Sequence, residues 1–205
     1  MLLNNYYWYF KEIIPHHICD KIIRYGLEKN QQLAYVGGEA PKAPLSKKET
    51  KQLKKTRDSM VAWIDDPWIY HQIHPFVRVA NQNAGWNYQW DFSEACQFTK
   101  YGLNQHYNWH CDMMQNPYQQ GRAKGHIRKL SLTLSLSDAN DYKGGELEFD
   151  FKNAESKKCK PVICHEIKSK GSIVVFPSYV WHRVRPVTEG IRYSLVNWNL
   201  GWPYK

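Results

Sequence analysis

Two side chains that can bind a metal ion stand two residues apart, at His110 and Asp112. In a β-strand, residues i and i+2 point to the same face, so an imidazole and a carboxylate at this spacing can contact one ion together. A further histidine, His182, follows the run GSIVVFP (171–177), which has the length and composition of a strand. Two histidines and one carboxylate leave the other positions of an ion open, as in non-haem iron(II) oxygenases.

A basic residue follows the distal histidine at a defined distance. Arg192 lies ten positions after His182, across the expected turn PVTEG (186–190). If the strands on either side of this turn pair, both side chains face the same interior. A buried guanidinium beside an open metal site favours a planar carboxylate, which it can hold with two hydrogen bonds. The 5-carboxylate of 2-oxoglutarate is such a group, and the pattern therefore predicts an iron site with this co-substrate.

The remaining histidines are weaker candidates. His106 and His110 form an HxxxH pair, but Tyr107 stands where a zinc-protease helix needs glutamate. Two alternatives stay open at this point. One is a zinc hydrolase with His106, His110 and His182 as ligands, and the other is a non-catalytic module that binds metal or sugar, against which the intact triad and Arg192 argue. The other histidines have no partnered acid at ligand spacing, so we interpret them as structural or surface residues: His16, His17, His71, His74, His126 and His165.

Composition indicates a single β-rich domain. The chain has 205 residues, of which 15% are aromatic, and aromatic residues favour strands. The formal net charge is +9, and much of it lies in the tract 42–57, KAPLSKKETKQLKKTR. This tract lacks interleaved aromatic residues that could stack on bases, so we interpret it as a solvated, mobile loop, with guidance of an acidic polypeptide as the alternative. Nucleic acid is therefore not the expected partner.

The cysteines and the apolar runs indicate a cytoplasmic protein. The five cysteines form no CxxC pair, and an odd, scattered set argues against a disulfide framework. The first residues, MLLNNYYWYFKEIIP, lack a basic segment followed by an apolar run, so we expect no signal peptide. No apolar stretch approaches the ~20 residues that span a bilayer, so we expect no membrane contact.

The spacing of apolar residues changes along the chain, from a helical pattern in the first half to a strand pattern in the second. Residues 1–94 predict a helical flank with a basic loop, as part of the same domain as the core. Pro15 opens one expected helix, and Asp65-Asp66-Pro67 opens a second, in which Pro75 can introduce a kink and which Gly85 closes.

The second half, residues 95–205, predicts strands separated by Gly, Pro and Asn. The alternation of Leu with Ser or Thr in KLSLTLSLS places one face in a core and hydroxyls on the other. Helices followed by strands indicate a mainly β fold with flanking helices on one side. The expected strands are 96–101, 129–137, 146–151, 161–167, 171–177 and 191–198.

Three segments resemble the prolyl 4-hydroxylase family of iron(II)- and 2-oxoglutarate-dependent dioxygenases. They are YGLNQHYNWHCD (101–112), RKLSLTLSLSDANDYKGGELEF (128–149) and KGSIVVFPSYVWHRVRPVTEGIRYSLVNWNL (170–200). The match is to the arginine-using branch, which includes bacterial PKHD-type and oxygen-sensing prolyl hydroxylases. It covers residues 95–200, whereas residues 1–94 match only loosely. Asn104, where a glycine is common, and Trp109, where charged residues are frequent, depart from the pattern and affect the expectation for substrate.

The resemblance implies a double-stranded β-helix (jelly-roll) core with iron bound by His110, Asp112 and His182. It implies that Arg192 and Tyr101 hold 2-oxoglutarate, with Ser131 near the same carboxylate. Positions that contact a peptide substrate in relatives match Arg128 and Trp198.

The implied reaction is hydroxylation of a prolyl residue in a peptide or protein. It uses O2, releases succinate and CO2, and has ascorbate as a possible reductant. The same iron chemistry on a nucleic acid or a free amino acid is the alternative. The polar loop 114–127 is either a lid over the iron or an ordinary surface connection. The oligomeric state does not follow from the sequence.

Overall fold

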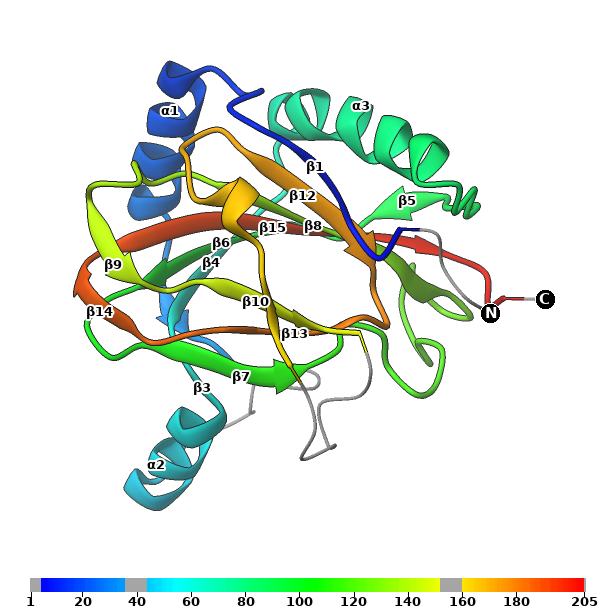
Figure 1. Ribbon diagram of the computed structural model, residues 1–205. Coiled ribbons are helices and arrows are strands. Elements are labelled where there is room, and N and C mark those ends of the chain that lie inside the picture. Colours follow the sequence, from blue (N-terminus) through cyan, green and yellow to red (C-terminus); the bar gives the residue numbers. More distant parts are fainter. Residues whose placement is uncertain (1–4, 36–43, 152–159, 205) are drawn as a thin grey trace.

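The computed structural model describes residues 5–35, 44–151 and 160–204. They form two antiparallel sheets that face each other, with helices on the outside (Figure 1). The fold is mainly β, as predicted, and the two sheets are consistent with a jelly-roll architecture.

The larger sheet has eight strands, and its long central strands β8 and β15 pair along most of their length. In spatial order its strands are β1 (Trp8–Phe10), β12 (Ile173–Pro177), β8 (Ile127–Ser135), β15 (Arg192–Gly201), β6 (Cys96–Tyr101), β4 (Met60–Ile64) and β2 (Gln32–Leu33), and β5 (Phe92–Ser93) pairs with β15.

The smaller sheet has five strands and carries the HxD segment. Its order is β11 (Val162–Ile163), β10 (Leu147–Asp150), β13 (Trp181–Val184), β7 (His106–His110) and β3 (Arg57–Asp58). A separate pair is formed by β14 (Val187–Gly190) and β9 (Tyr142–Gly144). The predicted strand 161–167 is shorter than expected, because a 3-10 turn, η1 (His165–Ile167), follows β11.

The alternation of Leu with Ser or Thr in β8 divides the molecule into two cores. The leucines point outward into a core that the large sheet shares with two helices, and they are fully buried: Leu130, Leu132, Leu134 and Leu136. The hydroxyl residues Ser131, Thr133 and Ser135 are buried on the opposite face, toward the smaller sheet. The predicted separation of an apolar and a hydroxyl face is therefore confirmed.

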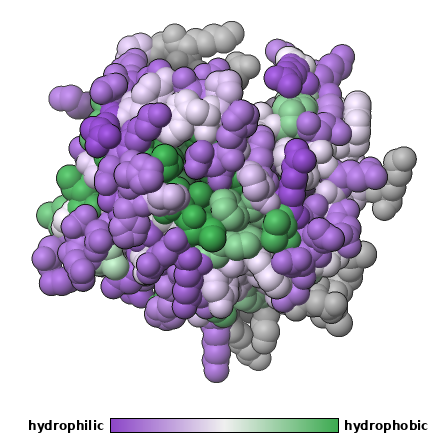
Figure 2. Space-filling view, turned by 90° about the horizontal axis from the view of Figure 1, so that it is seen from above, coloured by the Kyte–Doolittle hydropathy of each residue, from purple (hydrophilic) through white to green (hydrophobic). Residues whose placement is uncertain are grey.

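Helices α1 (His16–Glu28) and α3 (Pro67–Asn83) pack on the outer face of the large sheet (Figure 1). Ile22 of α1 and Ile73 of α3 are fully buried against it. Helix α3 continues through Pro75. Seen from above, hydrophobic side chains gather at the centre of this side of the molecule, within a hydrophilic surround (Figure 2). Among the described helices, none is both long and apolar enough to cross a membrane.

The basic tract is not the mobile loop that its composition predicted. Within its described part, Lys47–Thr56 form a helix, α2, which projects from the small-sheet side of the molecule (Figure 1). Ser46 and Glu49 form a complete capping box at its start, which satisfies backbone donors that would otherwise lack partners. Residues 42 and 43 of the tract lie outside the described residues.

Residues 1–94 also contribute more than a helical flank, since β1, β2, β4 and β5 extend the large sheet and β3 extends the small one. The expected pairing around the turn 186–190 is wrong as well. β13 belongs to the small sheet and β15 to the large one, while β14 between them pairs with β9. His182 and Arg192 thus approach a common interior from opposite sheets.

A glycine in α1 tests the packing between helix and sheet. A Cβ at Gly26 would overlap the ring of Phe98, which is fully buried and stacks on Tyr193. Alanine favours a helix interior by about 0.5–1 kcal/mol, but overpacking a core costs about 1–3 kcal/mol. We therefore expect Gly26→Ala to lower the free energy of unfolding, as measured by urea denaturation. Gly102→Ala, which meets only Gln105 Oε1 at 3.6 Å, is the control; equal losses in both variants would contradict the packing argument.

Candidate metal centre

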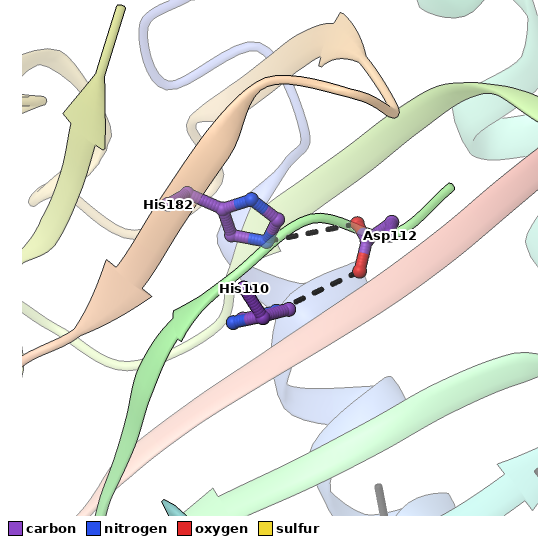
Figure 3. Close-up of side chains that lie close together, drawn as sticks. All are labelled: His110, Asp112 and His182. Atoms are coloured by element: carbon purple, nitrogen blue, oxygen red, sulfur yellow. Dashed lines mark ion pairs between the residues drawn. The ribbon is translucent and has the colours of Figure 1, made fainter. Parts of the chain in front are cut away.

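The three predicted metal ligands meet on the inner side of the small sheet (Figure 3). His110 is the last residue of β7, and His182 lies opposite it in β13. Nε2 of His110 lies 3.6 Å from Oδ1 of Asp112, and Nε2 of His182 lies 3.6 Å from Oδ2. One donor atom from each residue lies within 4.8 Å of the other two. These separations allow a single ion to contact all three groups.

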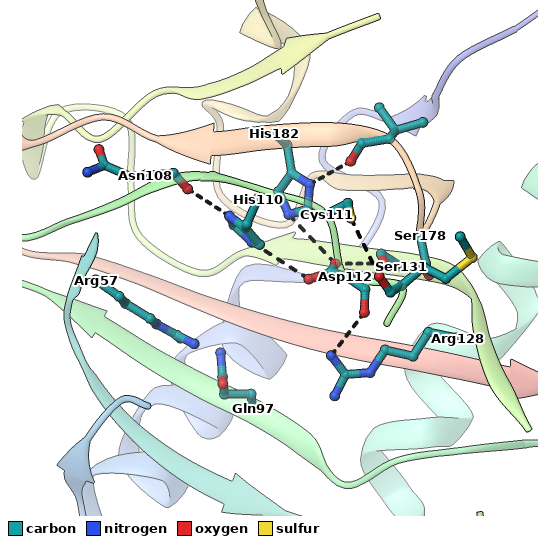
Figure 4. Close-up of polar contacts among 12 residues, drawn as sticks. Arg57, Gln97, Asn108, His110, Cys111, Asp112, Arg128, Ser131, Ser178 and His182 are labelled. Carbon is teal, nitrogen blue, oxygen red and sulfur yellow. Dashed lines mark hydrogen bonds and ion pairs between the residues drawn. The ribbon is translucent and has the colours of Figure 1, made fainter. Parts of the chain in front are cut away.

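Backbone hydrogen bonds fix the orientation of both imidazoles. Nδ1 of His110 lies 2.8 Å from the carbonyl oxygen of Asn108, and Nδ1 of His182 lies 2.9 Å from that of Val180 (Figure 4). A carbonyl only accepts, so Nδ1 carries the proton in each ring and donates it. Nε2 is then left with its lone pair directed at the common point, the arrangement typical of histidines that bind metal.

Asp112 follows the end of β7 instead of lying within the strand. Its backbone N–H donates to the carbonyl of Ser178 at 2.8 Å, which replaces the strand pairing that we had expected. Its side chain accepts a hydrogen bond from Ser131 Oγ at 2.7 Å, and Ser131 in turn lies 2.9 Å from Ser178 Oγ. The carboxylate is therefore held by the large sheet as well as by its own loop.

Charges around Asp112 keep it ionised although it is buried. Burial by itself would raise the pKa of this carboxyl. The two neighbouring histidines, the Arg128 guanidinium and the Ser131 hydrogen bond outweigh burial and lower the pKa of Asp112 to about 2. Burial, reinforced by the nearby His182, holds the pKa of His110 well below its usual range.

A β-bulge places His110 on the inner face. His182 pairs with His110, whereas Val184, two residues on, pairs with Tyr107, three residues back, so β7 contains one extra residue. Tyr107 and His110 consequently point to the same side and stack, with ring centroids 3.5 Å apart. The stacked Tyr107 ring restricts the rotation of the His110 imidazole.

This donor set fits a divalent cation. Neutral imidazole nitrogens and one carboxylate oxygen, with no thiolate in the cluster, suit a non-haem ferrous ion and leave positions for other ligands. The zinc-hydrolase alternative used His106 as a third histidine ligand. His106 is outside the cluster, and its ring nitrogens lie 3.2 and 3.4 Å from the backbone carbonyls of Asn104 and Lys55.

The predicted co-substrate residue Arg192 is buried between the two sheets. It is only 3% exposed, its guanidinium lies over the Tyr101 ring at 5.6 Å, and its NH1 donates to Ser194 Oγ at 3.3 Å. Among the described residues, none offers it a carboxylate. The large-sheet face around it carries buried hydroxyls, including Ser135, whose Oγ has no partner in the described structure. An unpaired, buried guanidinium on a polar wall fits a carboxylate ligand.

Ser131 is not where the resemblance placed it. In β15, Arg192 pairs with Tyr101, whereas Trp198, six residues on, pairs with Ser131. Six residues of strand span roughly 20 Å, so Ser131 does not share a carboxylate with Arg192. Its hydroxyl instead supports the metal ligand Asp112.

The two expected substrate residues lie together. The Arg128 guanidinium lies 3.9 Å from the centroid of the Trp198 ring, and it donates to both carboxylate oxygens of Glu94, at 2.8 and 2.6 Å. Although burial opposes the charge, these bonds to Glu94 raise the pKa of Arg128 above its usual range. Trp198 Nε1 is buried and has no partner in the described structure. Tyr118 of the loop 114–127 also bonds Glu94, at 2.6 Å.

Sequence reasoning missed Glu94 and Ser178. Glu94 lies outside the conspicuous motifs, and only its acidic character could have drawn attention to it. Ser178 directly follows the strand that leads to His182, but a lone serine carries no signal of its own.

The sequence matches the family model of the 2OG-Fe(II) oxygenase superfamily over residues 96–199, which is half of the chain. The chain therefore belongs to this superfamily, whose members use Fe(II), 2-oxoglutarate and O2. The predicted resemblance to the prolyl 4-hydroxylase family is supported by further relatives and by the fold.

Two bacterial relatives match the second half of the chain. A PKHD-type hydroxylase of Synechococcus sp. (strain CC9902) is 38% identical over 93 residues, which are 45% of this chain and 35% of the relative. A PKHD-type hydroxylase of Xylella fastidiosa (strain 9a5c) is 34% identical over 106 residues, which are 50% of this chain and 42% of the relative. The chain thus covers less than half the length of these curated relatives.

Solved structures share the fold over nearly the whole chain. A prolyl-4-hydroxylase of Pseudomonas putida has a TM-score of 0.67 and 18% identity, and the match covers 96% of this chain and 93% of that one. The viral collagen prolyl hydroxylase of Paramecium Bursaria Chlorella virus-1, in a 2OG complex, has a TM-score of 0.64 and 16% identity, with 97% of both chains covered.

The Ser131 hydrogen bond gives a test of the metal centre. Loss of a group that supports a metal ligand typically lowers metal affinity about 10- to 100-fold. We expect Ser131→Ala to weaken Fe(II) or Co(II) binding by this factor, as measured by anaerobic titration. Ser135→Ala is the matched control, because Ser135 is equally buried on the same face of β8 but makes no bond to a ligand. An unchanged affinity in Ser131→Ala would refute the supporting role.

Proposed function

We propose that the chain is an Fe(II)- and 2-oxoglutarate-dependent dioxygenase with a double-stranded β-helix core that hydroxylates prolyl residues in a peptide or protein. The observation that carries the dioxygenase assignment is the cluster His110, Asp112 and His182 within the same inter-sheet space as the buried Arg192, which has no carboxylate partner among the described residues. The cluster binds a cation and leaves some of its coordination positions open. Arg192 binds the carboxylate of 2-oxoglutarate that lies farther from the cation.

Each side chain has a defined task in this proposal. His110, Asp112 and His182 would hold Fe(II), which when bound supplies the oxidative chemistry that couples substrate hydroxylation to conversion of 2-oxoglutarate and O2 into succinate and CO2. Arg192 binds the 5-carboxylate of 2-oxoglutarate, and the Tyr101 ring beneath it keeps the guanidinium in place. The apolar side chains Phe149 and Phe176 pack beside His182 and exclude water from that side of the centre.

The prolyl substrate is supported by the neighbours and by the Arg128–Trp198 pair. The solved structures of similar fold include a prolyl hydroxylase in complex with a hypoxia inducible factor oxygen degradation domain peptide fragment from Trichoplax adhaerens. In this chain, the two residues that match substrate-contacting positions, Arg128 and Trp198, lie side by side, and Arg128 also lies next to the backbone of the metal ligand Asp112. Glu94 keeps Arg128 in place above the Trp198 ring. Ascorbate is the reductant that we expect to sustain turnover.

Variants of the two key groups should fail in different ways. We expect Arg192→Met to raise the KM for 2-oxoglutarate at least tenfold, because the carboxylate loses its charged, bidentate partner. His182→Ala should abolish succinate formation. Arg78→Met, which removes an exposed arginine from α3, should leave both parameters unchanged. Wild-type succinate formation by His182→Ala would disprove the assignment of the metal centre.

The substrate class is tested by mass spectrometry. Proline-containing peptides, oligonucleotides and free amino acids are incubated separately with the protein, Fe(II), 2-oxoglutarate, ascorbate and O2. We expect a gain of one oxygen on the peptide, with succinate formed in equal amount, and inhibition when Zn(II) replaces Fe(II). Oxygen gained only by an oligonucleotide or an amino acid would replace the prolyl proposal with that alternative while keeping the dioxygenase assignment.

A further inference from the structure

A second buried guanidinium, that of Arg57, faces the space between the sheets. Arg57 is 5% exposed and pairs with Tyr107 in the register of β3 and β7. Paired residues of neighbouring strands share a face, so Arg57 lies on the inner face of the small sheet, as Tyr107 and His110 do. Figure 4 shows its side chain extending from β3 into the space beneath His110.

Arg57 is linked to the metal centre through one aromatic ring. Its guanidinium carbon lies 4.4 Å from the centroid of the Tyr107 ring, and the same ring stacks on His110 at 3.5 Å. The guanidinium is thus separated from a metal ligand by the thickness of one tyrosine side chain. Any group that binds Arg57 from the cavity lies in the neighbourhood of the reacting centre.

Arg57 has no anionic partner among the described residues. Its only hydrogen bond there runs from Nε to Ser59 Oγ at 3.1 Å, which leaves both terminal nitrogens without an acceptor. Other arginines of the same region are paired: Arg128 with Glu94, and Arg183 with Glu148 at 2.6 Å. A buried guanidinium without a counter-charge is unfavourable, and stacking on tyrosine offsets only part of this. The terminal nitrogens of Arg57 can therefore donate to an anionic ligand.

The co-substrate does not explain why Arg57 lacks an anionic partner among the described residues. Arg192 already offers a buried guanidinium for the far carboxylate of 2-oxoglutarate, and the opposite end of that molecule is directed at the metal ligands. Arg57 lies on the facing sheet, beside Tyr107, whereas Arg192 lies beside Tyr101. The two guanidiniums are therefore placed for two different anions.

We propose that Arg57 is a carboxylate-binding residue for the primary substrate. This inference rests on the proposed dioxygenase function and specifies its substrate as one with a carboxylate close to the hydroxylated carbon. Since an extended residue spans about 3.5 Å, that carboxylate belongs to a residue within about two positions of the hydroxylated one. It comes either from an acidic side chain or from a free C-terminus. The fork of donors in arginine matches either source.

Peptides that differ in one group distinguish these sources. A blocked pentapeptide with a central proline carries either Glu or the isosteric Gln at each of the two positions before and after the proline. A shorter peptide ends in proline with either a free carboxylate or an amide. Binding is measured by calorimetry with Zn(II) in place of Fe(II) and with saturating 2-oxoglutarate, so that no turnover occurs and Arg192 is occupied.

We expect wild-type protein to bind one carboxylate peptide at least tenfold more tightly than its amide counterpart. In Arg57→Gln this ratio should fall to about one, because the carboxylate loses its charged partner. Arg57→Lys, which keeps the charge but not the fork, should retain part of the preference. Arg24→Gln is the matched control, since Arg24 is exposed on α1 and its loss should leave the ratio intact.

A second readout does not depend on a prolyl substrate. The Nε–H resonance of Arg57 is assigned in a 15N-correlated NMR spectrum by its loss in Arg57→Gln. N-acetyl-glutamate amide should shift this resonance, whereas N-acetyl-glutamine amide should not.

The outcomes separate the two proposals. A shifted resonance without binding of any prolyl peptide would keep the carboxylate subsite and refute the prolyl substrate. Prolyl hydroxylation without a preference for carboxylate peptides, or with a preference that survives in Arg57→Gln, would refute the subsite and keep the enzyme.

Discussion

The ionised carboxylate of Asp112, buried between two sheets, is the constraint around which the rest of the site is built. A buried charge is tolerated only when hydrogen bonds and opposite charges surround it. Here Ser131 and Arg128 supply them from β8, and Ser178 fixes the backbone. The two sheets are therefore connected through a metal ligand, and the geometry of the centre is coupled to the packing of the whole domain.

The need to surround this charge with polar groups also explains why the large sheet has an apolar outer face and a polar inner face. Leucines on the outer face of β8 pack against α1 and α3. This packing stabilises the fold and uses no side chain of the face that carries the metal centre. The inner face carries hydroxyls and arginines that would weaken a structural core. Phe149, Phe176 and Val174 fill only part of the inter-sheet space. Stability and ligand recognition are thus assigned to opposite sides of a single strand.

The sequence predicted the metal ligands and the long strands because their signals are local. The HxD spacing, the alternation in 129–137 and the apolar run before His182 each lie within a few residues. Short edge strands such as β2, β3 and β5 have too few residues to show a period. The helix α2 was missed because its charge concealed the capping pair Ser46 and Glu49. The separation of Ser131 from Arg192, and the role of Glu94, depend on strand register across the sheet, which no local pattern encodes.

The bulge in β7 allows two rings that lie three residues apart in the sequence to face the same interior. Three residues of β7 pass along two of β13, and this single surplus residue turns His110 inward. On a regular strand, residues three positions apart point to opposite faces, so without the surplus residue the Tyr107 ring could not stack on an inward-facing His110. The irregular pairing is thus a working part of the metal centre and not a defect of the strand.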